Sequence, residues 1–247
     1  MLDAGSSSAH ARAMLEGLRE EEVASPALVV LTHSHWDHVF GADELGVPVV
    51  AHVRAAEYLA EAAKLDWSDE ALDRRLAAGD VTQFHVDNVK QELPSPRLVR
   101  IVSPDIVFHE SLTFDLGDVV VRVRHLPNDH TDDGCVIFVE PDRVLFVGDA
   151  TCDSPTGAFT TALAVPLFET LRGFAPELVV EGHAGSVMSQ SEFEELADKI
   201  RLVGALVERF GSREAAILGE LGEAADTDMA DLVHAFVAGE RGATIEA

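Results

Sequence analysis

The sequence predicts an α/β protein whose sheets are covered by helices. Two observations carry this prediction. Short apolar runs typical of buried strands alternate with segments of helical periodicity, and the apolar period shortens to two residues in the middle of the chain. The 247 residues are 47% hydrophobic and include only two cysteines. This composition can bury a substantial core, and it excludes a disordered chain, a collagen and a disulfide-rich miniprotein.

The first half of the chain alternates strands with helices. A helix is expected to follow Ser8, whose hydroxyl suits an N-cap, and Pro94 and Pro96 mark irregular structure between residues 81 and 104. The elements predicted here are the end of a strand at 1–4, a helix at 9–22, strands at 27–31 and 49–51, and helical segments up to residue 76.

The second half predicts two β-hairpins and then mainly helices. Apolar runs flank the turn residues 116–118 and again 140–143. A helix from Ser191 to Phe210 is expected to begin with a capping box between Ser191 and Glu194. The other elements predicted here are strands at 112–114, 119–121, 136–139, 144–147 and 178–180, and helices after 160, at 213–221 and at 228–238.

A histidine-rich segment comes directly after the strand at 27–31. It reads His33-Ser34-His35-Trp36-Asp37-His38. Side chains two apart on an extended backbone point the same way, so His33 and His35 can bind one cation while Asp37 and His38, where the chain turns, reach another. The alternative is a run of solvated loop residues, which is disfavoured because further ligand types follow at other strand ends.

Three more residues of ligand type stand next to apolar, strand-like runs: His130, Asp149 and His183. Ligands at the ends of rigid strands can converge on one cavity. A two-metal site needs a bridging carboxylate, three neutral donors for one cation, and two histidines with a second carboxylate for the other. Each residue alone has an ordinary structural explanation, but the full set predicts a dinuclear metal centre.

These motifs resemble those of the metallo-beta-lactamase-fold hydrolases, in the same order, over residues 1 to about 190. They are Leu2-Asp3-Ala4-Gly5, Thr32 to His38, Asp129-His130-Thr131, Val147-Gly148-Asp149-Ala150 and Glu181-Gly182-His183. The resemblance implies a four-layer αββα sandwich with the metals at one edge between the sheets. The ligands that it implies are His33, His35 and His130 for the first metal, Asp37, His38 and His183 for the second, and Asp149 as the bridge.

The chain departs from the family pattern in two places. Family members usually carry one or more N-terminal edge strands before the segment that matches Leu2 to Gly5, whereas this sequence begins inside that motif. We therefore expect the edge strands to be dispensable or the start to be truncated. Asp132 and Asp133 replace the usual small residues after the third histidine and add negative charge beside the site. The expected domains are a catalytic domain at 1–190, which includes a substrate cap at 51–110, and a C-terminal helical segment at 191–247 packed on it.

The expected function is hydrolysis of a small ester, thioester, lactone or amide by a metal-bound hydroxide. Two zinc ions are the expected cofactors, with iron or manganese as alternatives. Asp37 is the candidate catalytic residue, because its carboxylate can orient the nucleophile or pass a proton to the leaving group. Asp129, Asp132 and Asp133 are candidate acceptors for ligand imidazole N–H groups, and Trp36 is a candidate wall of the pocket. Solvated-loop or packing roles are the alternatives for these four residues.

Other functions stay open at this point. The dioxygenase branch of the same fold performs iron-based redox chemistry with ligands that this sequence cannot distinguish from a zinc set, whereas the flavodiiron branch typically has a glutamate in place of His35. A phosphodiesterase or nuclease is a second alternative, and a binding protein that keeps metals for structure alone is a third. The remaining histidines are assigned structural or surface roles: His10, His52, His85, His109, His125 and His234.

Charge restricts the partners. The chain has 18 Lys and Arg against 44 Asp and Glu, a formal net charge of -26, and such a surface repels nucleic acid and anionic membranes. The acidity also argues against DNA contact by the last two helices, although their spacing resembles a helix-turn-helix; a covering layer or a homodimer contact is favoured. Without a signal peptide or a membrane-span pattern, we expect a cytoplasmic enzyme with a small-molecule substrate.

Overall fold

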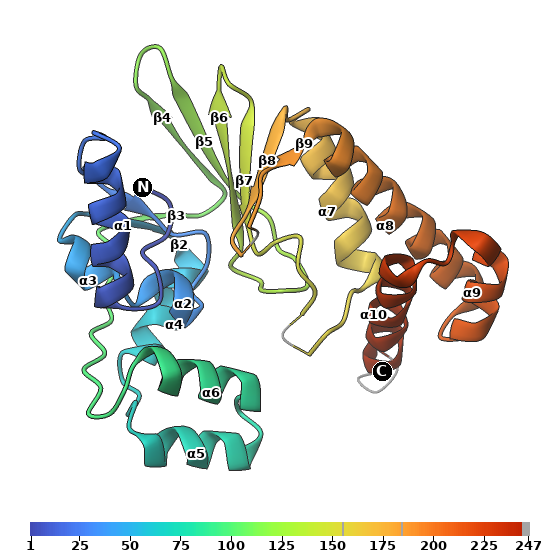
Figure 1. Ribbon diagram of the computed structural model, residues 1–247, viewed down its shortest axis with the longest axis horizontal. Helices are drawn as coiled ribbons and strands as arrows, with labels where there is room; N and C mark the ends of the chain where they lie inside the picture. The colour runs from blue at the N-terminus through green and yellow to red at the C-terminus, as the bar shows by residue number, and fades with distance from the viewer. Residues whose placement is uncertain (155, 184, 244–247) are drawn as a thin grey trace. The chain divides into compact units, whose positions relative to one another are not determined.

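The computed structural model describes residues 1–154, 156–183 and 185–243, and its chain forms two compact units, Met1–Glu110 and Ser111–Ala247 (Figure 1). Each unit contains one sheet and a set of helices. These are the components that the predicted α/β fold requires. The predicted domain limits stay a prediction.

The first unit is built on the parallel sheet β1-β2-β3. Its strands and helices are α1 (Ser8–Glu20), β1 (Val29–Val30), α2 (Trp36–Val39), α3 (Ala42–Leu45), β2 (Val49–His52), α4 (Val53–Ala62), α5 (Asp69–Ala78), α6 (Gln83–Glu92) and β3 (Ile106–Phe108). All residues of β1 and β2 are buried, as expected for parallel strands that are covered on both faces. Leu2 adds a parallel bridge to Val30, so the strand end predicted at 1–4 is present as one bridge.

Capping explains where the first helices begin. The Ser7 hydroxyl accepts a hydrogen bond from the backbone N–H of His10, so the N-cap of α1 is Ser7 and not the predicted Ser8. Thr82 caps α6 in the same way, inside a region where the residue pattern predicted no regular element. Residues 93–105, which follow α6, have no helix or strand, as Pro94 and Pro96 predicted.

The second unit is built on the six-stranded sheet β4-β5-β6-β7-β8-β9, which is antiparallel except between β7 and β8. Its elements are β4 (Ser111–Asp115), β5 (Val120–His125), β6 (Cys135–Glu140), β7 (Val144–Gly148), α7 (Thr161–Gly173), β8 (Leu178–Glu181), β9 (Met188–Ser189), α8 (Gln190–Phe210), α9 (Glu214–Leu221), a 3-10 turn (Gly222–Ala224) and α10 (Thr227–Ala243). Both predicted hairpins are confirmed.

One core joins this sheet to its helices. Buried residues of β6, β7 and β8 pack with α7, α8, α9 and α10, and Figure 1 shows α7 and α8 side by side. Phe168 of α7 stacks on Phe193 of α8, with 6.1 Å between the ring centroids. Because α9 and α10 contribute Ile217 and Phe236 to the same core, the last helices form a covering layer within this unit.

The predicted capping box of α8 is wrong by two residues. The structure places it between Ser189 and Glu192, not between Ser191 and Glu194. The sequence offers two serines with a glutamate three positions on, and the pairing of β9 decides between them. Ser189 pairs with Leu178 as the last strand residue, so the helix begins directly after it.

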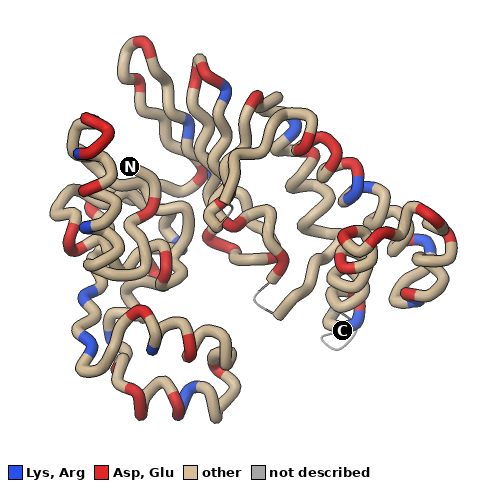
Figure 2. Tube along the Cα trace, in the orientation of Figure 1, with Lys and Arg blue, Asp and Glu red and all other residues tan. Residues whose placement is uncertain are grey.

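Acidic residues lie along the helices and loops of both units (Figure 2). Within the described part of the chain, no helix is both long and apolar enough to span a membrane.

We expect Ile200→Ala to lower the free energy of unfolding by about 2–5 kcal/mol, because it leaves a cavity in the core. Ile200 is 1% exposed, whereas Leu202 on the same helix is 44% exposed, so Leu202→Ala is the control and should cost less than about 1 kcal/mol. Urea unfolding followed by circular dichroism measures both. Equal losses would show that this face of α8 does not pack as described.

Candidate metal centre

The histidine loop of the first unit brings its candidate ligands together. His33 follows β1, and His35 is the N-cap residue of the single-turn helix α2. The His33 ring lies 4.5 Å from the His35 ring and 4.1 Å from the His38 ring, centroid to centroid. The Asp37 Oδ2 atom is 3.8 Å from His38 Nε2. The convergence of His33 and His35 predicted from their spacing is therefore present.

Asp3 supports this loop, a role that the sequence analysis did not assign. Its Oδ1 atom accepts a hydrogen bond from the backbone N–H of Thr32 at 2.6 Å. Its Oδ2 atom accepts from the Thr32 hydroxyl at 2.8 Å and from His38 Nδ1 at 2.9 Å. The signal available in the sequence was an acidic residue at a strand end within the motif Leu2-Asp3-Ala4-Gly5.

These hydrogen bonds determine the tautomers of two histidines. An ionised carboxylate can only accept, so His38 carries its proton on Nδ1 and presents the Nε2 lone pair. The Thr32 hydroxyl has one proton, which it donates to Asp3, so it accepts from His33 Nδ1 at 3.0 Å. His33 therefore also presents Nε2. Asp3 thus prepares both rings to bind a metal through Nε2.

The backbone around Asp3 is fixed by close contacts. Asp3 has a φ of 52°, in the left-handed region that aspartate tolerates better than most residues. The N–H groups of Asp3 and Ala4 donate to the carbonyls of Val30 and His38 at 2.9 and 2.7 Å. Gly41 allows this packing, because a Cβ atom at that position would lie 2.0 Å from the Ala4 carbonyl oxygen.

The second unit brings together the other three candidate ligands. Asp149 follows β7 and is 4% exposed. Its Oδ2 atom is 3.4 Å from His130 Nε2 and 3.1 Å from His183 Nε2. His183 follows β8, and its side chain is 58% exposed. Three residues that are far apart in the sequence therefore meet at one carboxylate oxygen.

This arrangement fits a metal ion. The Asp153 carbonyl oxygen can only accept, so His130 Nδ1 donates to it at 3.1 Å and the Nε2 lone pair faces Asp149. A lone pair and a carboxylate oxygen repel each other unless a cation or a proton lies between them. Burial makes the charge of Asp149 costly, and a divalent cation would offset that cost. The donor set of neutral imidazoles and carboxylates is one that zinc accepts.

The remaining predicted site residues take several positions. The Asp129 carboxylate accepts from the backbone N–H and the hydroxyl of Thr160, at 3.1 and 2.7 Å, and so anchors the start of α7. Asp133 is buried and accepts from the Thr131 hydroxyl. Asp132 is exposed, and its carbonyl accepts a hydrogen bond from His125 Nε2 at 2.8 Å. Trp36 is partly buried and packs within the first unit.

Cys152 lies three residues after Asp149 and is partly buried. Burial raises the pKa of its thiol to about 12, and the negative charge of Asp149 adds to this effect. The thiol is therefore protonated at neutral pH. A protonated thiol is a poor metal ligand and a poor nucleophile.

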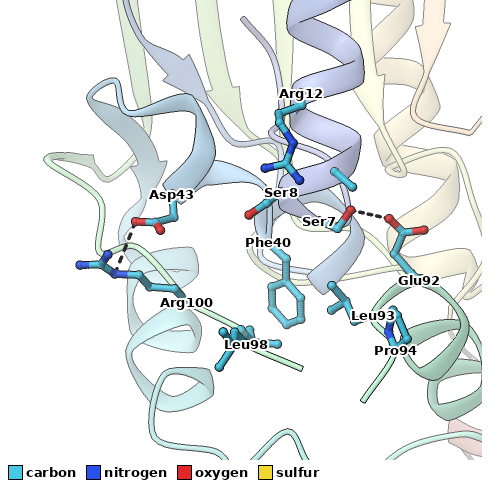
Figure 3. Close-up of a pocket in the computed structure, with 12 residues that line it drawn as sticks. Ser7, Ser8, Arg12, Phe40, Asp43, Glu92, Leu93, Pro94, Leu98 and Arg100 are labelled. Atoms are coloured by element: carbon cyan, nitrogen blue, oxygen red, sulfur yellow. Dashed lines mark hydrogen bonds and ion pairs between the residues drawn. The ribbon is translucent and has the colours of Figure 1, made fainter. Parts of the chain in front are cut away.

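A separate cavity of about 500 Å³ lies at the start of α1 in the first unit. Figure 3 shows two pairs among its lining residues, Glu92 with the Ser7 hydroxyl and Arg100 with Asp43. None of the residues that line this cavity is a predicted metal ligand. It is therefore not part of the candidate metal centre.

Residues 1–230 match the metallo-beta-lactamase superfamily. The chain belongs to this superfamily. Its members are mostly metal-dependent hydrolases, so the expected metal-dependent, hydrolase-like character is supported at that level. Among curated proteins, none matches this metallo-beta-lactamase-fold chain in sequence.

Solved structures confirm the predicted fold class. A metallo-beta-lactamase from Pontibacter korlensis is 20% identical with a TM-score of 0.54, over 81% of this chain and 80% of that one. A metallo-beta-lactamase family protein from Thermus thermophilus is 19% identical with a TM-score of 0.58, over 99% and 84%. A sec-alkylsulfatase from Pseudomonas sp. is 15% identical with a TM-score of 0.63, and 89% of this chain spans only 38% of that enzyme.

We expect Asp3→Asn to weaken metal binding by about 10- to 100-fold, because it removes the charge and replaces one of the two acceptor oxygens, which set the tautomers of His33 and His38, with an N–H donor. Competition with a chromophoric chelator measures the affinity. Asp73→Asn is the control, since Asp73 is 60% exposed and pairs with Lys90. An unchanged affinity in Asp3→Asn would show that Asp3 does not prepare the ligands.

We expect Cys152 to react slowly with iodoacetamide at pH 8, because its raised pKa keeps the thiolate scarce. Labelling of the folded protein should be about a hundredfold slower than labelling in urea, and it should accelerate as the pH rises further. Peptide mass spectrometry separates Cys152 from Cys135. Equal rates in the folded and unfolded states would contradict the protonated thiol.

Proposed function

We propose that this protein is a dinuclear zinc hydrolase that acts on a small ester, thioester, lactone or amide. The observation that carries the proposal is that hydrogen bonds orient three candidate ligand histidines, so that each can bind a metal through Nε2. His33 and His38 in one unit, and His130 in the other, hold their protons on Nδ1 and present Nε2. A buried carboxylate, Asp149, faces two imidazoles.

The proposed ligand sets use residues of both units. His33, His35 and His130 would hold the first metal, and Asp37, His38 and His183 the second, with Asp149 bridging the two. When bound, two divalent cations act as Lewis acids on the substrate and lower the pKa of the water they hold. The two carboxylates offset part of the cation charge.

Asp37 would move the proton that hydrolysis requires. It lies on the single-turn helix α2, and its side chain is 26% exposed, so its carboxylate can exchange protons with substrate and solvent. A carboxylate in this position can accept a proton from the nucleophile and donate it to the leaving group. Asp3 would keep the adjacent His38 in place during this transfer, because its hydrogen bond fixes the ring.

A small substrate is favoured over a polyanion because the net charge is -26. The test of reaction class is metal analysis of the purified protein, followed by lactone, thioester, phosphodiester and beta-lactam substrates. About two equivalents of zinc and turnover of an activated ester or thioester support the proposal. Iron with oxygen-dependent turnover would replace it with dioxygenase chemistry, and cleavage of nucleic acid would replace it with a nuclease.

We expect Asp149→Ala to lose metal and most of the hydrolytic activity, because it removes the proposed bridge. Plasma mass spectrometry gives the metal content, and hydrolysis of 4-nitrophenyl acetate gives the activity. His125→Ala is the control, since His125 is not a proposed ligand and its Nε2 atom donates a hydrogen bond to the Asp132 carbonyl at 2.8 Å. Full metal and activity in Asp149→Ala would refute the bridging role.

A further inference from the structure

Two tryptophans and two basic side chains gather beside the metal loop. We call this group the aromatic–cationic cluster: Trp36 of α2, Trp67 before α5, Arg75 of α5 and His85 of α6. The Arg75 guanidinium lies 4.8 Å from the centre of the Trp67 ring. The His85 ring is 6.2 Å from Trp36 and 6.5 Å from Trp67, centroid to centroid. All four residues belong to the first unit.

Arg75 differs from Arg97 and Arg12 of this unit because it forms no ion pair within 4.0 Å among the described residues, although the carboxylates of Asp66 and Asp80 act on its charge from farther away. Its Nε and Nη2 atoms are buried and have no hydrogen-bond partner among the described residues. By contrast, Arg97 pairs with Asp69 at 2.8 Å, and Arg12 pairs with Glu44 at 2.7 Å. Because the chain has 44 acidic residues, a shortage of carboxylates does not explain this. A guanidinium with unused donors is a site for an acceptor that comes from outside the chain.

His85 connects the cluster to the metal loop. Burial lowers the pKa of its imidazole, the positive charge of Arg75 lowers it further, and the negative charge of Asp37 opposes both effects. The ring is therefore close enough to both residues to feel their charges. Trp36, which packs against it, is the direct neighbour of Asp37 on α2. An acceptor bound by the cluster would thus lie near the candidate catalytic carboxylate.

We propose that the aromatic–cationic cluster is a recognition subsite for a substrate that carries a carboxylate. The carboxylate would bind Arg75 and His85, and the apolar part next to it would lie against Trp36 and Trp67. The proposal rests on the proposed function, because the bound carboxylate belongs to a substrate only if the protein is a hydrolase. It adds the chemical class of the substrate: a small ester, thioester or amide with a free acid group.

The electrostatics favour this assignment. A guanidinium offers a planar pair of donors that matches a carboxylate, and such charge-assisted pairs are stronger than neutral ones. The strongly negative surface repels an anionic substrate at long range. A local cation whose Nε and Nη2 atoms have no hydrogen-bond partner among the described residues would allow such a substrate to bind. Arg75 is only partly buried as a residue, although its Nε and Nη2 atoms are buried.

Tryptophan fluorescence tests the proposal directly, because the two tryptophans of the chain are both in the cluster. The purified full-length protein is titrated with phenylacetate and with phenylacetamide, which has the same shape without the charge. We expect a saturable change with phenylacetate and binding at least about tenfold weaker with the amide. Equal responses to the two compounds, or no response to phenylacetate, would overturn the proposal.

Variants assign the effect to Arg75. Arg75→Gln should weaken phenylacetate binding about tenfold or more and leave phenylacetamide unchanged, and Arg75→Lys should retain part of the preference. Arg74→Gln is the matched control, because Arg74 is the adjacent arginine, 70% exposed and 4.0 Å from Asp66. Wild-type binding by Arg75→Gln would overturn the proposal, as would an equal loss in Arg74→Gln.

Two further measurements keep the outcomes separate. Thermal unfolding of each variant identifies a purely structural role, in which Arg75→Gln loses stability and its binding of both compounds falls together. If Arg75→Gln fails to fold, His85→Gln is titrated instead, and unchanged phenylacetate binding there would count against the subsite. The titration needs no turnover, so selective binding without hydrolysis of any substrate would refute the proposed function and leave the subsite standing.

Discussion

The carboxylate of Asp3 is the interaction on which the histidine loop depends. It receives three hydrogen bonds, two from Thr32 and one from His38, and through them it sets the tautomers of His33 and His38. Hydrogen bonds to a charged group contribute about 1.5–3 kcal/mol each. The left-handed backbone of Asp3 costs about 1–2 kcal/mol. The bonds outweigh this strain, so the unusual conformation persists because it aims the carboxylate.

Asp149 is the carboxylate around which the candidate ligands of the second unit gather, but its surroundings differ from those of Asp3. Asp3 receives hydrogen bonds from its partners, whereas Asp149 is almost fully buried and faces two imidazole Nε2 atoms. The hydrogen bond from His130 to the Asp153 carbonyl directs a lone pair toward this carboxylate. A lone pair that faces a carboxylate in this way is repelled unless a cation or a proton lies between them, and a metal ion would supply that cation. In both units, therefore, a hydrogen bond holds the Nδ1 proton of a candidate ligand histidine, and Nε2 is the ring nitrogen that can bind a metal.

Local sequence patterns predicted the elements and some of the ligand geometry. The two-residue period marked both hairpins, and the spacing of His33 and His35 predicted their approach. Asp3 was missed because its partners, Thr32 and His38, lie 29 and 35 residues away, beyond any local pattern. The approach of Arg75 and His85 to Trp67 was not predicted for the same reason, since it depends on how α5 and α6 pack.

The proposed function depends on a pair of metal ions held by the candidate ligands. Anomalous diffraction at the zinc edge, from crystals of the purified protein, tests it most directly. Two peaks about 3.5–4 Å apart are expected, with Asp149 and the histidines of the loop at 33–38 as ligands. A single peak, no peak, or metal held by residues of one unit alone would contradict it.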